Sequence, residues 1–125
     1  MSPLAASGWI GLGGFLGANA RWWVAQAVRG VVGNQWPWGI FLVNVGGSFL
    51  LGLLSTWGGG ALWANERWRL FLAIGFLGAY TTFSTFELET LTLAESGRAL
   101  AAAAYVLASV GAALLAVWVG ARLGR

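Results

Sequence analysis

The stretch GFLGAYTTFSTF, from Gly75 to Phe86, decides the fold because it interrupts a segment that is otherwise apolar enough to cross a membrane. Gly75 and Gly78 weaken a helix, and the hydroxyl side chains that follow compete with the backbone for hydrogen bonds. A break would free backbone groups at a depth where irregular structure is tolerated only inside protein or beside a water-filled cavity. The alternative is an unbroken helix whose hydroxyls bond to their own preceding turn, and the spacing alone does not separate the two.

The composition indicates a chain that is embedded in a lipid bilayer. Of its 125 residues, 58% are hydrophobic and only 9% are charged, with a mean hydropathy of +0.74. A soluble domain of this size carries about a quarter charged residues. The arginines are scattered singly rather than clustered, so no nucleic-acid surface is expected despite a pI near 10.7. The chain has no cysteine and no histidine, and no catalytic constellation is recognisable, so an enzyme is not predicted.

Four stretches have the length that a helix needs to cross a bilayer core, about 20 residues. They are residues 4–28, 38–57, 68–93 and 98–123. Most of the nine tryptophans lie near the ends of these stretches, as interfacial aromatic belts require. The sequence therefore predicts an all-α membrane protein, with residues 1–125 forming a single domain of four transmembrane helices.

The arginines give this domain only a weak preferred orientation. Four crossings place Arg67, Arg69, Arg122 and Arg125 on one side, against Arg29 and Arg98 on the other, with Arg21 added if it lies toward that end. Such a small excess is a poor topology signal under the positive-inside rule, so the chain could insert both ways round. Because four short helices enclose little space, we expect an antiparallel, dual-topology homodimer.

Polar groups inside a span are costly and each is a functional candidate. Asn44 offers an amide in the middle of the second stretch; it could serve a passing ion, or make an interhelical hydrogen bond that holds a dimer together. Arg21 could attract anions to an entrance, or its side chain could reach up to the lipid headgroups. Phe83 and Phe86 share one helix face and present ring edges that are electrostatically positive, although core packing is the ordinary role of such a pair.

Backbone carbonyls and acidic side chains complete the set of candidates. Carbonyls freed by a break in the Gly75–Phe86 stretch would suit a hard cation such as Na⁺. Glu87 and Glu89 follow the break but cannot face the same direction, because they are two residues apart on a helix. One could pair with an arginine and the other could face solvent.

Three segments together resemble the CrcB or Fluc family of microbial fluoride channels. They are GGFLGANARW (Gly13–Trp22), GIFLVNVGGSFLLG (Gly39–Gly52) and GFLGAYTTFSTFELE (Gly75–Glu89), and the four-helix layout extends the likeness to the whole chain. The resemblance implies a passive fluoride-selective channel in the plasma (inner) membrane of a prokaryote, which exports F⁻ and lowers its cytoplasmic concentration. It also implies two pores in an antiparallel homodimer whose third helix is broken near the dimer centre.

The resemblance assigns roles to individual residues. Main-chain carbonyls of Gly78 and Thr81 from both subunits would hold a structural Na⁺. The fluoride pore would be lined by Asn44, Phe83, Ser84, Thr85, Phe86, Tyr105 and Ser109. Arg21 and Glu89 match a basic and a polar position near its vestibules. Departures from the family pattern are Ile40, Ala79, Tyr80 and Glu87; main-chain ligation of Na⁺ survives them, and the role of Glu87 stays open.

Two other functions compete with a fluoride channel. A small dual-topology multidrug exporter also has four helices, but it needs a membrane-embedded carboxylate, and the first stretch carries Arg21 and no acid. A purely structural membrane subunit would conduct no ion and would leave the combination of Asn44, Phe83 and Phe86 unexplained.

Overall fold

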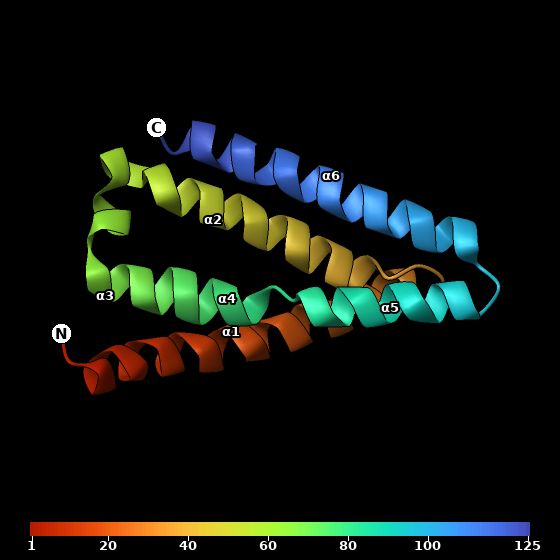
Figure 1. Ribbon diagram of the computed structural model, residues 1–125, viewed down its shortest axis with the longest axis horizontal. Helices are drawn as coiled ribbons and strands as arrows, with labels where there is room; N and C mark the ends of the chain where they lie inside the picture. Colours follow the sequence, from red (N-terminus) through yellow and green to blue (C-terminus); the bar gives the residue numbers. More distant parts are fainter.

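The computed structural model describes all 125 residues, and its regular structure is entirely helical. The elements in chain order are α1 (Pro3–Val32), α2 (Trp38–Ala64), α3 (Glu66–Trp68), η1 (Arg69–Leu77), α4 (Gly78–Tyr80), α5 (Phe83–Glu95) and α6 (Ala99–Leu123). The elements α3 to α5 follow one another along one direction, so the chain forms four long antiparallel segments (Figure 1). Both termini lie at the same end, and the turn between α5 and α6 lies at the other (Figure 1).

The first segment starts and stops where local chemistry dictates. The Ser2 side chain accepts a hydrogen bond from the Ala5 amide at 3.2 Å, and proline occupies the first helical position, where its missing N–H costs nothing. Gly33, with φ 77°, ends α1. The helix runs four residues beyond the predicted limit of 28, which carries Arg29 into its last turn.

The second segment loses regular geometry close to its predicted end at residue 57. Trp57 has ψ 132°, and the next three glycines have positive φ values of 60°, 69° and 85°. Residues with a Cβ avoid this left-handed region, so the GGG run makes a turn that other residues would not. Asn65 then caps α3, with its side chain accepting from the amides of Arg67 and Trp68.

The third segment is interrupted within the Gly75–Phe86 stretch. Residues 69–77 form a π-helix, an element often found at functional sites. Thr81 (φ −81°, ψ 156°) and Thr82 (φ −151°, ψ 124°) are then extended, and α5 begins at Phe83. The Thr82 side chain caps α5 by accepting from the Thr85 amide at 3.3 Å. The backbone is therefore broken, and the unbroken alternative is wrong.

The four segments pack most closely as two pairs, α1 with η1 and α2 with α6. Glycines permit this approach: a Cβ on Gly17 would overlap the Phe76 carbonyl, and one on Gly52 would overlap the Val117 carbonyl. Small residues of this kind let membrane helices approach closely. Thr56 Oγ1 also donates to the Ala121 carbonyl at 2.8 Å across α2 and α6.

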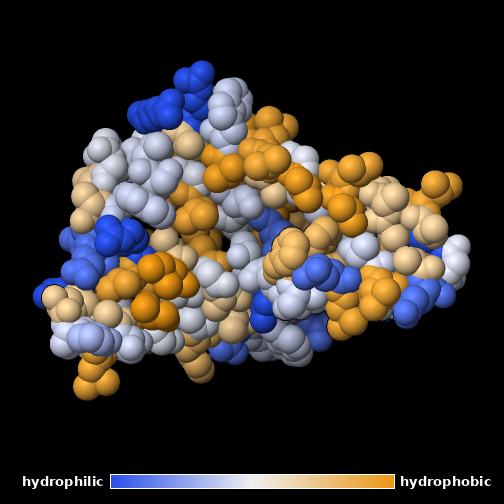
Figure 2. All heavy atoms as spheres, in the orientation of Figure 1, coloured by the Kyte–Doolittle hydropathy of each residue, from blue (hydrophilic) through white to orange (hydrophobic).

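Three helical segments are long and apolar enough to cross a membrane: Trp38–Ala64, Glu66–Glu95 and Ala99–Leu123. At 30 residues α1 is long enough, but polar residues such as Asn19, Arg21 and Gln26 lower its mean hydropathy. Many large hydrophobic side chains are exposed, including Leu100, Leu107 and Leu114, and Figure 2 shows such side chains along the length of the molecule. A surface of this kind suits lipid rather than water, so the chain is a multi-pass membrane protein.

Candidate functional site: the broken helix and its cavities

The side chain of Asn44 from α2 forms hydrogen bonds with the extended backbone at the break in the third segment. Its Oδ1 accepts from the Thr82 amide at 2.8 Å, and its Nδ2 donates to the Thr82 carbonyl at 3.0 Å. The amide thus satisfies both backbone groups of Thr82, which is 9% exposed, as a neighbouring strand would. These bonds join two helical segments of one chain rather than two chains, so both roles expected of Asn44 stay predictions. One N–H of its amide remains for another acceptor.

The break diverts the donors that a continuous helix would supply to two particular carbonyls. The Thr82 amide, which would bond to the Gly78 carbonyl, bonds to Asn44 instead. The Thr85 amide, which would bond to the Thr81 carbonyl, bonds to Thr82 Oγ1. Main-chain oxygens that lose their helical donors in this way are suitable ligands for a hard cation. Gly78 and Thr81 therefore fit the Na⁺ ligation that the resemblance implies.

On the other side of the break, the backbone presents donors. Phe83 and Ser84 open α5, and the first amides of a helix have no intrahelical acceptor. The helix dipole adds partial positive charge at this end. The two halves of the third segment therefore offer opposite polarity at one place: carbonyls before the break and amides after it.

A cavity of about 330 Å³ lies beside the break. It brings together several of the predicted site residues, and its lining comes from α2, from both sides of the break and from α6. The residues that line it are Asn44, Gly47, Ser48, Leu51, Ala73, Leu77, Gly78, Thr81, Thr82, Phe83, Phe86, Ser109, Val110 and Ala113. The wall is apolar apart from a few amide, hydroxyl and backbone groups, and no charged side chain lines it.

Ser109 on α6 is the outstanding polar group of this cavity. It is 7% exposed, and its hydroxyl is buried without a hydrogen-bond partner. Hydroxyls elsewhere in the helices bond back to the preceding turn, as Thr90 does to Phe86 and Thr92 does to Leu88. A buried hydroxyl left unpaired costs about 1–3 kcal/mol. Ser109 is one of the residues that line the cavity, so this wall contains a polar group that has no partner within the protein.

Phe83 and Phe86 lie together, with ring centroids 5.7 Å apart, but their surroundings differ. Phe86 is 7% exposed and belongs to the hydrophobic core, whereas Phe83 is 70% exposed. Core packing thus accounts for Phe86 and leaves Phe83 without a packing role in the single chain. Both residues line the cavity.

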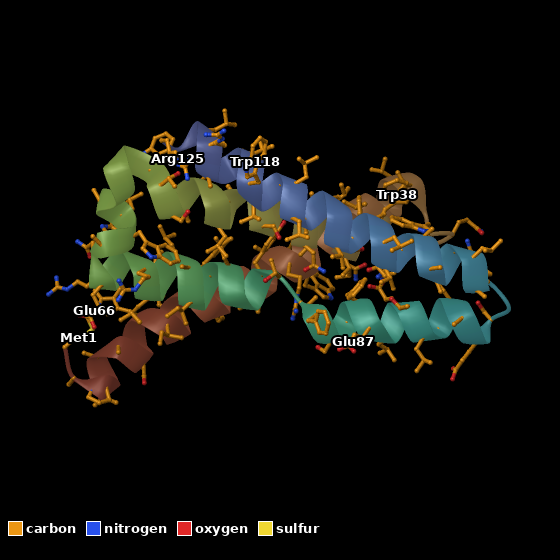
Figure 3. All side chains as sticks on the ribbon, turned by 45° about the horizontal axis from the view of Figure 1, so that its top comes forward. Met1, Trp38, Glu66, Glu87, Trp118 and Arg125 are labelled. Carbon is orange, nitrogen blue, oxygen red and sulfur yellow. The ribbon has the colours of Figure 1, made fainter.

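Tyr105 continues the site toward the turn between α5 and α6. It is fully buried, and its ring meets Phe86 edge to face at 5.1 Å. Its hydroxyl donates to Glu89 Oε1 at 3.2 Å. The predicted pairing of one glutamate with an arginine is therefore replaced, for Glu89, by a hydrogen bond from tyrosine. Glu87 is exposed and lies on the outer side of α5 (Figure 3).

Three more of the predicted residues lie outside the cavity lining, as Tyr105 and Glu89 do. Ser84 is exposed and Arg21 is half-buried on α1. Thr85 takes part in capping, with its Oγ1 atom 3.2 Å from that of Thr82.

Sequence reasoning also missed Gly47, where a Cβ would overlap the Thr81 side chain. The signal that could have found it is the pair of glycines that follows shortly after Asn44 in the second stretch. The absence of a side chain at Gly47 lets α2 pass close to the break.

Comparisons with known proteins identify relatives over nearly the whole chain. The family model described as CrcB-like protein, Camphor Resistance (CrcB), matches residues 8–121. A protein of Methylococcus capsulatus, named fluoride-specific ion channel FluC, is 51% identical over 93% of this chain and 51% of its own length. A protein of the same name from Rhodospirillum rubrum is 42% identical over 89% of this chain and 88% of its own length. Another from Acidobacterium capsulatum is 44% identical over 94% of this chain and 94% of its own length.

The chain thus spans about half of the Methylococcus relative and most of the other two. The match to the family model covers nearly all of the segments described above, including the break and the cavity beside it. The resemblance carried by the three segments is confirmed: this chain belongs to the CrcB family.

Proposed function

We propose that this chain forms a fluoride-selective passive channel that carries F⁻ out of the cytoplasm. The observation that carries the proposal is the unpaired buried hydroxyl of Ser109 in a cavity that also holds the Asn44 amide and the amide end of α5. The relatives named fluoride-specific ion channels support the choice of ion.

The chemistry of the cavity suits a small, strongly hydrated anion. An ion that sheds water must find replacement hydrogen bonds, because uncompensated desolvation of a charge is prohibitive. The cavity supplies donors from Ser109 and Asn44, and Phe83 adds a polarised ring edge. No arginine lines it, so the anion would be released again, as conduction requires.

Three further features belong to the same proposal. Two copies assemble antiparallel, with α1 as the fourth crossing, which is supported by the weak arginine bias and by the exposed Phe83. The carbonyls of Gly78 and Thr81 hold a structural Na⁺, supported by their diverted helical donors. The membrane is the plasma (inner) membrane of a prokaryote, where the negative internal potential drives F⁻ outward after HF has entered and dissociated.

The decisive experiment is ion flux from liposomes containing the purified protein. Under an applied potential, we expect release of fluoride and not of chloride. Equal rates for the two halides would defeat the proposal, and so would no fluoride release from protein shown to be folded and inserted. Labelling of single cysteines placed at the termini tests the dimer: accessibility from one membrane face alone would exclude antiparallel assembly.

The multidrug exporter has less support. Its mechanism needs a carboxylate exposed to a drug site within the membrane. The cavity beside the break contains no acid at all.

A further inference from the structure

A second cavity lies between the break and the end of the molecule where α5 turns into α6. Its volume is about 320 Å³, and its lining comes from the end of α1, the connection to α2, the start of α2 and the second half of α5. The residues that line it are Arg29, Gly33, Asn34, Trp36, Pro37, Trp38, Gly39, Ile40, Leu88, Glu89, Thr92 and Leu93. None of them lines the first cavity.

Two buried aromatic side chains link the two cavities. Tyr105 contacts the lining of the second cavity through Glu89, which accepts a hydrogen bond from its hydroxyl at 3.2 Å, and through Trp36, whose ring lies 5.1 Å from its own. On its other side, Tyr105 meets Phe86 at 5.1 Å between centroids, and Phe86 lines the first cavity. The cavities are therefore consecutive, with Tyr105 and Phe86 between them.

The entrance to the second cavity is built as a fixed structure. Trp36 packs against Trp38 and Phe41, with centroids 4.6 Å and 5.1 Å apart. The Arg98 guanidinium, at the start of α6, donates to the Gln35 carbonyl and ties the connection between α1 and α2 to the α5–α6 end. Arg98 is used in this bond and does not line the cavity.

The charges in the second cavity are one cation and one anion. Arg29 is exposed in the last turn of α1, and its guanidinium donates to the Gln26 side chain at 3.3 Å. Glu89 is half-buried and bonded to Tyr105. Without Arg29, the carboxylate would leave a negative entrance, and a negative entrance lowers the local concentration of an anion.

We propose that the second cavity is an anion vestibule of the channel, in which Arg29 offsets the charge of Glu89 and gathers fluoride at the entrance. This inference rests on the proposed fluoride conduction. Arg29 acts at a distance in water, so it raises the rate at which ions arrive without binding them tightly. The position was not among the sequence candidates, because α1 extends beyond its predicted end and only the fold brings Arg29 and Glu89 to one cavity.

Fluoride flux from liposomes tests the inference with a set of charge variants measured at low and high concentrations of an impermeant salt. An elementary charge within about 4–8 Å of an ion in water changes its local concentration roughly two- to fivefold. We expect Arg29→Gln to lower flux by that factor at low ionic strength, and the deficit to vanish near 1 M salt, where the Debye length is about 3 Å. Arg29→Lys should keep the wild-type rate.

The double variant Arg29→Gln with Glu89→Gln should recover flux, because the entrance becomes neutral while the amide introduced at position 89 keeps an acceptor oxygen for Tyr105. Arg67→Gln removes an equal charge from a residue that lines neither cavity and should behave as wild type. Arg29→Ala provides a second neutral variant should the first assemble poorly.

Two results would overturn the inference. One is an Arg29→Gln rate equal to wild type at every ionic strength, and the other is an equally slow Arg29→Lys, which would indicate shape rather than charge. Both are read against a conducting wild-type channel, whereas failure of the proposed function itself would show as no fluoride flux in the wild type.

Discussion

The pair of hydrogen bonds between Asn44 and Thr82 offers the sharpest test of the structure. Asn44→Ala removes both bonds and leaves the amide and carbonyl of Thr82 without partners. Single hydrogen bonds between membrane helices contribute about 0.6 kcal/mol on average and about 1.7 kcal/mol at most. Two bonds therefore predict a loss of roughly 1–3 kcal/mol. Since Thr82 is only 9% exposed, water cannot readily replace them, and we expect the upper half of that range.

The measurement is the free energy of unfolding in mixed micelles titrated with a denaturing detergent. Asn19→Ala is the matched control, because Asn19 Nδ2 also donates to a carbonyl, that of Phe15 at 2.7 Å, but on an exposed face of its own helix. We expect the control to change stability by less than about 0.5 kcal/mol. Asn44→Asp keeps the acceptor for the Thr82 amide and sets a carboxylate oxygen against the Thr82 carbonyl, so it should be at least as destabilising as Asn44→Ala.

Equal effects of Asn44→Ala and Asn19→Ala would refute this reasoning. That result would mean that the break stands without the amide pair, and that the helix is interrupted for a reason other than the contact from α2.

Three more expectations use the same preparations. Phe86→Ala should cost about 3–5 kcal/mol of stability because it truncates a buried aromatic side chain, whereas Phe83→Ala should cost less than about 1 kcal/mol because that side chain is 70% exposed. Both variants should lower fluoride flux. Full flux in Phe83→Ala would show that the Phe83 ring is not part of the pore. Gly17→Leu should yield no folded protein on size-exclusion chromatography, because a Cβ at position 17 overlaps the Phe76 carbonyl. Gly11 has open space around it, so Gly11→Leu should fold. Recovery of folded Gly17→Leu would contradict the packing of α1 against η1. Tyr105→Phe should lower the free energy of unfolding by about 1 kcal/mol, because phenylalanine cannot donate to Glu89. The same detergent titration measures this loss, and unchanged stability would show that the bond is not formed in the membrane.

Residue order alone was enough to predict the class of protein and to indicate the stretch in which the third crossing could be interrupted. Hydropathy and length predict long crossing helices, because a bilayer core admits only backbone that satisfies its own hydrogen bonds. The glycines and hydroxyls between Gly75 and Phe86 predict a weak point, and the structure has its break at Thr81 and Thr82. These are local properties, so a short window of sequence is enough to reveal them.

The surroundings of the break became visible only in the folded chain, because contacts between residues far apart in sequence leave no local signal. Asn44 of α2 pairs with Thr82 of the third segment, and Arg29 of α1 lines the same cavity as Glu89 of α5. The same is true of the difference between Phe83 and Phe86: three residues apart on one helix, they looked alike in sequence, yet one is exposed and the other lies in the core. Burial depends on which helix packs against which face, and that is settled by the whole set of segments rather than by any one of them.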